Sequence, residues 1–512
     1  MTINSLKERP LLLILIFAAT LRIVAAFFSE GYLMHDDHFW VVESSASWAD
    51  GEDYNNWMPW SQEELNKEPK PHYTNLFYAS LHYLYFLGAD SIGLDNPREQ
   101  TLILRIIHGL LSLTSVLLVY RISLKIGGLK PAILSGILMA SLAWIPLLSV
   151  HQIVEVFTIL PLLAFSWVLT KNKWTFNTLL IAGIWLGIAT GLRYQVGVMG
   201  LGLVASFYVH YNDKKVWAKS CIIIGSSALL IFSLTQVPTD IYLWGEPFAQ
   251  LKAYIEYNLN NSSEYPQGNT LTYFFVILAC TAPPLSFFFF RDYLKSWKDY
   301  SWLVLPSLAF ILFHFLFPNK QERFILPALP YIIIVGSVVW YQAVRNKSLT
   351  KFILAISFVI NTILLIPLTL SSKNASQLKA MDFIRMQGDL DSFLYVQTDS
   401  NSYPPRFYCD NWNDYTFADK NTDVFGQRRA HCIEPEVSTP NYIVFVGNER
   451  LAEFVYSFKE HYKSMEYIGH FGPGRFDRFL NYLNPRIPIK RTMVYKIDPT
   501  LECYDFVISE TD

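Results

Sequence analysis

Long apolar runs, separated by short polar connections, dominate the first 370 or so residues of the chain. The run at residues 10–28 follows Lys7 and Arg9, is long enough to span a bilayer and lacks the small-residue cleavage site of a signal peptide, so we expect a retained first helix. Ten further runs lie at residues 101–121, 131–149, 151–170, 176–192, 194–210, 217–237, 271–290, 301–317, 323–343 and 351–371. The pattern predicts an α-helical polytopic membrane protein with about eleven transmembrane helices.

The charges of the polar connections predict an orientation. Lys and Arg gather in six of them, at residues 7–9, 121–130, 171–173, 214–219, 291–298 and 345–351. If eleven segments span the membrane, all six connections lie on one side, which the positive-inside rule assigns to the cytosol. The opposite side then carries the loops at residues 29–100 and 238–270, the turn at 318–322 and the C-terminal tail. The apolar segment 73–89 would invert every later connection if it spanned, so we expect a re-entrant or surface-lying helix there.

From residue 373 onward the pattern is typical of a soluble α/β domain. Strand-like runs alternate with helical stretches such as residues 449–464, and the strand-like runs lie at residues 392–398, 441–447 and 491–497. Three cysteines of the tail, Cys409, Cys432 and Cys503, allow one disulfide and leave one thiol over, with the pairing open. The sequence thus predicts a transmembrane domain at residues 1–372 and a non-cytosolic soluble domain at residues 373–512.

Composition supports a membrane protein with a sizeable polar part. Of the 512 residues, 52% are hydrophobic and only 16% charged, against roughly 25% charged in soluble domains, which excludes a purely soluble enzyme. The mean hydropathy of +0.24 is lower than membrane helices alone would give. The 41 Lys and Arg against 43 Asp and Glu give a net charge of -2, so nothing points to nucleic acid. Because no GxxxxGK[ST] and no GxGxxG precedes a helix, ATP-driven chemistry is unsupported.

The loop after the first apolar run opens with a cluster of titratable residues, His35, Asp36, Asp37, His38 and then Glu43. Adjacent carboxylates repel each other, so one is expected to take up a proton readily, as a general base acting on a sugar hydroxyl must. Equally, Asp36 and Asp37 could only cap a helix beginning at His38. A metal site is a third alternative, but four consecutive residues cannot all face one ion and no HExxH or paired CxxC supports zinc.

A second cluster lies in the short turn between two apolar runs, where Lys320, Glu322 and Arg323 follow each other closely. Two cations at a membrane surface suit a lipid-linked phosphate, because Arg binds phosphate oxygens in a fork and Lys acts as a point charge. The alternatives are an ion pair of Arg323 with Glu322 and simple snorkelling of the side chains.

Two more arginines lie in apolar surroundings, which indicates a pairing inside the bundle. Arg193 follows the run at residues 176–192, on the same side as the other candidate residues. Arg22, within the first run, is expected to make a structural pair with Glu155.

Four segments of this pattern resemble the motifs of one family. The segments are LRIVAAFFSEGYLMHDDHFWVVE at residues 21–43, TGLRYQVGVM at 190–199, TDIYLWGEPFAQLKAYIEYN at 239–258 and NKQERFILPALP at 319–330. They are similar, in order and in membrane side, to motifs of glycosyltransferase family 22. This family comprises GT-C type membrane enzymes that use lipid-phosphate mannose in GPI-anchor and N-glycan assembly. His35, Trp40 and Asn319 depart from the family's pattern, which has Pro, Gln and His at those positions.

The resemblance implies an inverting glycosyltransferase that moves a sugar, mannose in the family, from a polyprenyl-phosphate donor to a glycan or glycolipid acceptor on the non-cytosolic face. It implies no metal and no cofactor, and a location in a bacterial inner membrane or the endoplasmic reticulum. Asp36 and Asp37 are then the catalytic acids. The donor phosphate is expected at Arg323, Lys320 and Arg193. Supporting or acceptor-binding roles are expected for His38, Glu43, Asp240 and Glu322.

Two other classes account for part of the pattern. A transporter or flippase of a lipid-linked or anionic substrate would explain the membrane-embedded charges, but the sequence has no inverted repeat and no matched pair of Gly/Pro-broken helices. A membrane-anchored binding protein would explain the tail and leave eleven spans without a role.

Overall fold

The chain folds into two compact units. A computed structural model describes residues 3–171, 173–261, 268–269, 271–343, 347–398, 403–434, 437–448, 450–487 and 489–504, so residues 344–346, in the last of the basic connections, lie outside it. The bundle unit comprises Met1–Phe27, Asn56–Leu81 and Ile103–Thr369. The sheet unit comprises Phe28–Asn55, His82–Leu102 and Leu370–Asp512.

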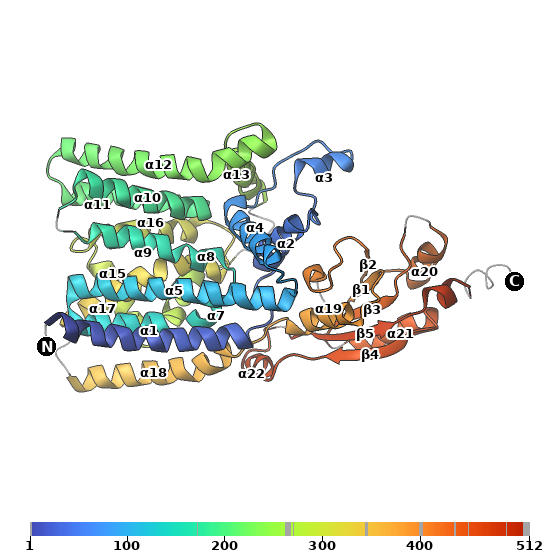
Figure 1. Cartoon of the computed structure of the whole chain (residues 1–512). Helices are drawn as coiled ribbons and strands as arrows, with labels where there is room; N and C mark the ends of the chain where they lie inside the picture. The colour runs from blue at the N-terminus through green and yellow to red at the C-terminus, as the bar shows by residue number, and fades with distance from the viewer. Residues whose placement is uncertain are drawn as a thin grey trace. The chain divides into compact units, whose positions relative to one another are not determined.

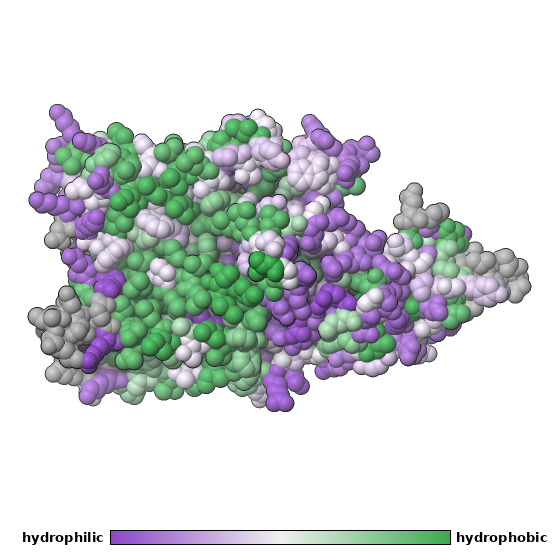
Figure 2. All heavy atoms as spheres, viewed as in Figure 1, coloured by the Kyte–Doolittle hydropathy of each residue, from purple (hydrophilic) through white to green (hydrophobic). Residues whose placement is uncertain are grey.

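Five helical stretches in the described ranges are long and apolar enough to cross a membrane. They are α1 (Ile3–Phe28), α5 (Pro97–Gly127), α12 (Lys214–Trp244), α18 (Lys347–Thr369) and the stretch Glu322–Ala343, which joins η3 (Glu322–Ala328) to α17 (Leu329–Ala343). The helices α1, α5, α12 and α18 run with roughly parallel axes (Figure 1). Hydrophobic side chains cover the visible face of this bundle (Figure 2), as lipid contact requires.

The remaining predicted runs also form helices, but these helices are shorter. They are α6 (Leu129–Ser141), α7 (Ile145–Val150), α8 (Val154–Phe157), α9 (Ile159–Leu169), α10 (Phe176–Leu192), η2 (Tyr194–Val198), α11 (Met199–His210) and α16 (Ser301–Leu316). The prediction of a helical polytopic membrane protein is therefore confirmed. Among the residues that the structure describes, five helices qualify as spans by length and composition, or six if one bent pair counts. The number eleven stays a prediction.

The run at residues 271–290 is not the single straight helix that the sequence predicted. It forms α14 (Thr272–Cys280) and α15 (Leu285–Lys295), which are bent by 115° relative to each other. Pro283 and Pro284 lie in the break. Because proline has no N–H and its ring clashes with the preceding turn, two in succession end the first helix.

Side chains of α18 satisfy backbone groups that such breaks expose. Asn361 accepts a hydrogen bond from the N–H of Ala143 (2.8 Å) and donates one to the carbonyl of Ser141 (2.6 Å), across the gap between α6 and α7. Ser357 accepts from the N–H of Leu285 (3.1 Å), at the start of α15. Where no water is present, an unpaired backbone group costs several kcal/mol. By pairing these groups, α18 removes that cost at both helix breaks.

Arg22 does not pair with Glu155, contrary to the prediction. Its guanidinium donates to the carbonyls of Ala140 (2.9 Å), Met139 (3.3 Å) and Ala18 (3.2 Å) and to Ser112 Oγ (2.7 Å). The carbonyls of Met139 and Ala140 belong to the last turn of α6, where helical partners run out and a cation is favourable. Arg22 is thus a structural cap of another helix.

Shorter helices occupy the polar loops. The apolar segment 73–89 forms most of α4 (Leu76–Ser91), whose 16 residues measure about 24 Å, less than the roughly 30 Å of hydrocarbon. It is not among the candidate spans in the described ranges, and its re-entrant or surface-lying placement stays a prediction. The other loop helices are η1 (Asp37–Glu43), α2 (Ser44–Ala49), α3 (Pro59–Glu64) and α13 (Ala249–Asn261).

The C-terminal part contains a five-stranded mixed sheet of order β2-β1-β3-β5-β4. The predicted strands are present as β1 (Phe393–Gln397), β3 (Tyr442–Gly447) and β5 (Arg491–Lys496). Strand β1 pairs in parallel with β3, and β5 runs antiparallel to β3. Every residue of β1 and β3 is buried, which explains their continuous apolar sequences.

The sequence analysis missed the two edge strands. These are β2 (Tyr415–Ala418), parallel to β1, and β4 (Glu466–Phe471), antiparallel to β5. Both are largely half-buried or exposed, and their mixed polar composition lacks the apolar run that marks a central strand. Helix α19 (Ala375–Gln387) packs on strands β3, β4 and β5. Helix α21 (Leu451–His461) packs on β3 and also contacts α20 (Val424–Ile433). The remaining elements are η4 (Arg406–Tyr408) and α22 (Arg475–Leu483).

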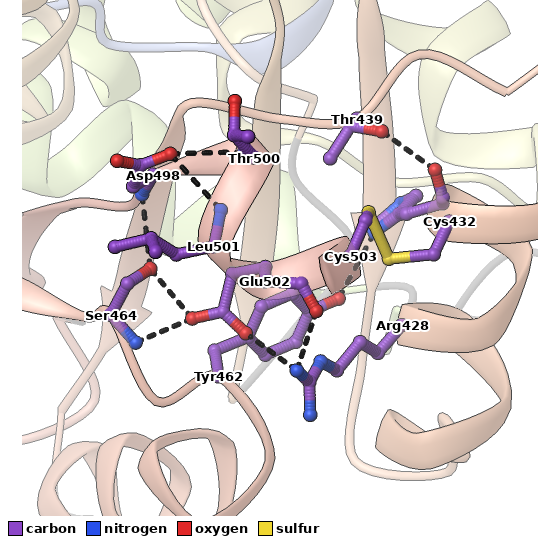
Figure 3. The surroundings of a disulfide bond; sticks show 11 residues. Arg428, Cys432, Thr439, Tyr462, Ser464, Asp498, Thr500, Leu501, Glu502 and Cys503 are labelled. Atoms are coloured by element: carbon purple, nitrogen blue, oxygen red, sulfur yellow. Dashed lines mark hydrogen bonds and ion pairs between the residues drawn. A yellow bond between two sulfur atoms is a disulfide. The ribbon is translucent and has the colours of Figure 1, made fainter. Parts of the chain in front are cut away.

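A disulfide links Cys432 of α20 to Cys503 near the end of the described chain, and Cys409 is buried as a free thiol. This settles the pairing that the sequence left open. Beside it, Arg428 pairs with the buried carboxylate of Glu502 at 3.2 Å, and Glu502 also accepts a hydrogen bond from the hydroxyl of Ser464 (2.6 Å; Figure 3). The last described residues are thereby fastened to α20 and to the segment before β4.

We expect the Cys432→Ser/Cys503→Ser variant to lose about 2–4 kcal/mol of sheet-unit stability, because the bond closes a long loop in the unfolded chain. Thermal unfolding of the full chain, with and without reductant, measures the loss. Reductant should destabilise the wild type and leave the variant unchanged. Equal unfolding temperatures of oxidised wild type and variant would contradict this expectation.

The Asn361→Leu variant should be less stable by about 2–4 kcal/mol, since it leaves one buried N–H and one buried carbonyl without partners. Thermal unfolding in lipid nanodiscs measures the change. Ile363→Leu, at a 58% exposed position of the same helix, is the matched control. If both variants unfold like the wild type, Asn361 does not hold the break between α6 and α7.

Candidate functional site

The predicted acids lie at the start of a π-helix in the sheet unit. Asp37 is the first residue of η1 and is 8% exposed. Asp36 precedes it in helical conformation, makes no side-chain capping bond, and lies with Oδ1 3.5 Å from Nδ1 of His35. The side chain of Asp36 is 34% exposed. The helix-capping alternative for Asp36 is therefore not what the structure shows, and this carboxylate remains accessible.

The π-helix brings His38 and Glu43 together. In a π-helix the hydrogen bonds run from residue i to i+5, so side chains five apart lie on one face. His38 Nε2 lies 3.2 Å from Glu43 Oε1, with the side chains 6% and 0% exposed. The His38 ring also stacks on Tyr32, with centroids 4.7 Å apart and planes 10° apart. An ordinary α-helix would have turned Glu43 away, so the π geometry creates this buried pair.

The following loop fixes the π-helix from outside. Tyr54 donates its hydroxyl hydrogen to the carbonyl of Phe39 (2.5 Å), and Ser44 Oγ donates to the same carbonyl (2.9 Å). Asn55 donates to Ser44 Oγ (2.7 Å). Burial raises the pKa of Tyr54 well above its usual value, so the phenol keeps its proton and remains a donor.

In the bundle unit, two arginines share one buried carboxylate. Arg193 follows α10 in extended conformation, Arg323 lies in η3, and Glu155 lies in α8. Glu155 Oε1 is 2.5 Å from Nη1 of Arg193 and 3.6 Å from Nε of Arg323. The three side chains are 3–9% exposed. Two cations and one anion thus meet in a site largely removed from solvent.

Neutral groups also hold the two arginines. Gln195 Oε1 accepts from Nε of Arg193 (3.0 Å), and Gln321 Oε1 accepts from Nε of Arg323 (2.9 Å). Both guanidinium groups lie near the ring of Phe324, at 5.0 and 5.7 Å from its centroid, within cation–π range. Each arginine is therefore oriented by a glutamine two residues away and by a shared aromatic ring.

Lys320 lies in the same turn but uses its ammonium differently. Its Nζ donates to the carbonyls of His314 (3.1 Å), Phe315 (2.9 Å) and Phe317 (2.7 Å), at the C-terminal end of α16. These three bonds employ all three of its donors. Lys320 caps a helix end, where a cation is favourable, and partial burial lowers its pKa.

The other two predicted residues have contrasting environments. Asp240 is fully buried in α12. Glu322 is exposed at the first position of η3. Arg323 pairs with Glu155 at 3.6 Å, so the alternative of an Arg323–Glu322 pair is not needed to explain its burial.

The predicted partner of Glu155 was wrong. The sequence does mark Glu155 as unusual, because it is the one acidic residue in the apolar run at residues 151–170. The choice of Arg22 as partner was wrong, since sequence spacing cannot tell which of several buried arginines meets a distant acid. Within the described ranges, no three His, Cys, Asp or Glu side chains converge as metal ligands.

Comparisons with known proteins point to one family and one fold. Residues 13–409 match the model of the Alg9-like mannosyltransferase family. ArnT from Cupriavidus metallidurans, solved with undecaprenyl phosphate, is similar in structure with a TM-score of 0.61 at 10% identity, over 94% of this chain and 97% of that one. The oligosaccharyltransferase AglB from Archaeoglobus fulgidus, solved with an inhibitory peptide and a dolichol-phosphate, gives a TM-score of 0.51 at 12% identity, over 86% of this chain and 69% of that one. No curated protein sequence matches the chain.

We expect Glu43→Leu to loosen the π-helix by about 1–3 kcal/mol, because it removes the carboxylate that lies 3.2 Å from the buried Nε2 of His38. Glu43→Gln keeps an acceptor at the same place and should cost less. Hydrogen exchange of residues 37–49, followed by mass spectrometry on the full chain, measures both. Equal protection in the two variants would show that the pair does not stabilise this helix.

Proposed function

The chain belongs to the Alg9-like mannosyltransferase family, and from this we propose that it transfers mannose from a polyprenyl-phosphate donor to a hydroxyl group of a glycan or glycolipid, with inversion at the anomeric carbon. It is an integral membrane glycosyltransferase of GT-C type. The observation that carries the proposed donor is the buried pair Arg193 and Arg323, because such a pair suits the phosphate of a lipid-linked sugar.

The donor phosphate is assigned to Arg193 and Arg323. Guanidinium groups bind phosphate oxygens through short, charge-assisted hydrogen bonds. Buried cations also exert a stronger field than exposed ones, since little water screens them. Negative charge grows on the leaving phosphate during transfer, so the same arginines stabilise the transition state as well as the bound donor.

Lys320 keeps its proposed role as a third phosphate cation, with a condition. Its ammonium now binds three carbonyls, so a phosphate oxygen has to replace one of them. Without such an exchange Lys320 contributes through its field and by fixing the turn that carries Arg323.

Asp36 is assigned as the base and Asp37 as the group that orients the acceptor, with the reverse order as the alternative. The carboxylate takes the hydroxyl proton while the acceptor oxygen forms a bond to the anomeric carbon. The bond between that carbon and the phosphate oxygen breaks, and its electron pair stays on the phosphate. A phosphodiester with one negative charge becomes a phosphate monoester. His38, Glu43, Asp240 and Glu322 are proposed as supporting or acceptor-binding residues.

We further propose eleven membrane spans, with Asp36, Asp37 and the C-terminal part on the non-cytosolic face. The distribution of Lys and Arg in the short connections supports this orientation. The membrane is then a bacterial inner membrane or that of the endoplasmic reticulum.

Asp36→Asn should lower sugar transfer about 10²–10⁴-fold, as loss of a general base does, while donor binding persists. Arg323→Ala should weaken donor binding itself. Purified protein in nanodiscs, supplied with polyprenyl-phosphate mannose and acceptor glycolipids, measures transfer and donor binding separately. If Asp37→Asn has the larger effect, the two acids exchange roles.

Two exposed positions provide matched controls for the same chemical changes, Asp414→Asn and Arg475→Ala. Both should retain wild-type transfer. A wild-type protein that neither binds nor hydrolyses polyprenyl-phosphate sugars, across several sugars, would refute the proposed donor.

A further inference from the structure

The buried carboxylate of Glu155 is not needed to hold the arginines in place. Gln195 and Gln321 already accept a hydrogen bond from Nε of Arg193 and Arg323, respectively. Glu155 approaches both arginines with the same oxygen, Oε1, while Oε2 is buried and makes no hydrogen bond within the described residues. What Glu155 adds beyond the glutamines is one unit of negative charge.

A buried charge is costly, so its presence calls for a reason. Carboxylates within apolar segments are rare and commonly functional, and here one carboxylate faces two guanidinium groups, which leaves the site with a net positive charge. Glutamine would fit the same space and keep an acceptor for Arg193. The feature to explain is therefore the net positive charge that a single acid at residue 155 leaves beside two buried arginines.

The reaction changes the charge of the group that the arginines are proposed to bind. The donor is a phosphodiester with one negative charge. The product is a phosphate monoester, which carries about 1.5 to 2 negative charges at pH 7 because its second pKa is near 6. Coulomb energy is proportional to each charge, so the Coulomb attraction of a cationic site is greater for the product than for the donor.

We propose that Glu155 tunes the charge of the arginine pair in favour of the donor. By lowering the positive charge of the site by one unit, it weakens binding of the dianionic product about twice as much in free energy as binding of the monoanionic donor. Glu155 thereby limits product inhibition and speeds release of the polyprenyl phosphate. Glu155 acts through the charge of the arginine pair, and this inference rests on the proposed donor site.

Glu155→Gln tests the idea because it removes the charge and keeps the shape. We expect the affinity ratio of polyprenyl phosphate to polyprenyl-phosphate mannose to rise about tenfold at pH 7.5, with a lower kcat and stronger product inhibition. At pH 5 the product is largely a monoanion, so the change in ratio should nearly vanish. Glu155→Asp, which keeps the charge, should retain a ratio near that of the wild type.

Gln321→Glu is the complementary variant. It adds a negative charge at the acceptor that lies 2.9 Å from Nε of Arg323, so it should lower the same ratio at pH 7.5. Because the two variants are predicted to act in opposite directions, a general loss of packing cannot imitate the result. If Glu155→Gln does not fold, the double variant Glu155→Gln/Gln321→Glu restores one negative charge beside Arg323, and it should return the ratio towards that of the wild type.

Binding of both ligands to the full chain in nanodiscs, measured calorimetrically, separates the outcomes. Opposite shifts of the ratio in the two variants support the proposal. If the wild type binds both ligands and neither variant changes the ratio, the role of Glu155 is overturned, whereas the proposed function still stands. A wild type that binds neither ligand overturns both.

Discussion

The hydrocarbon core of a membrane offers no water, so every backbone N–H and C=O within it must find a partner in the protein. The bundle unit meets this constraint with side chains at several of its helix breaks. Asn361 joins the ends of α6 and α7, and Ser357 serves the start of α15. Arg22 and Lys320 use cationic donors for the last carbonyls of α6 and α16. Polar residues that look like candidates for chemistry are, in these cases, what allows irregular helices to exist.

The same apolar surroundings strengthen the electrostatic interactions of Glu155, Arg193 and Arg323. Charges removed from water act on one another, and on a bound ion, through a low effective dielectric constant. Glutamines and the ring of Phe324 orient the guanidinium groups without consuming their charge. The site therefore separates two tasks, because neutral groups set its geometry and Glu155 sets its charge. At the proposed donor site, that separation would affect product release as well as binding.

In the sheet unit the decisive local feature is a π-helix. Its i to i+5 spacing pairs His38 with Glu43 in the interior, directly after Asp36 and Asp37. The chain thus passes from an accessible carboxylate to a fully buried one within eight residues. Such local departures from α-helical geometry often occur at functional sites, and here the departure fixes the orientation of the segment that bears the proposed base.

The sequence by itself determined the membrane class, the positions of the apolar helices, the three inner strands and the charged segments of the family, because apolar period and run length report removal from water, whether into protein or into lipid. Only the tertiary structure decided which groups meet. It gave Arg22 helix carbonyls instead of Glu155, brought Glu155 to Arg193 and Arg323, and paired Cys432 with a cysteine 71 residues away. The sequence pattern also did not predict the two edge strands or the bend after α14. The physical reason is that the pattern along the chain records whether a side chain leaves water, whereas its partner depends on how distant segments pack.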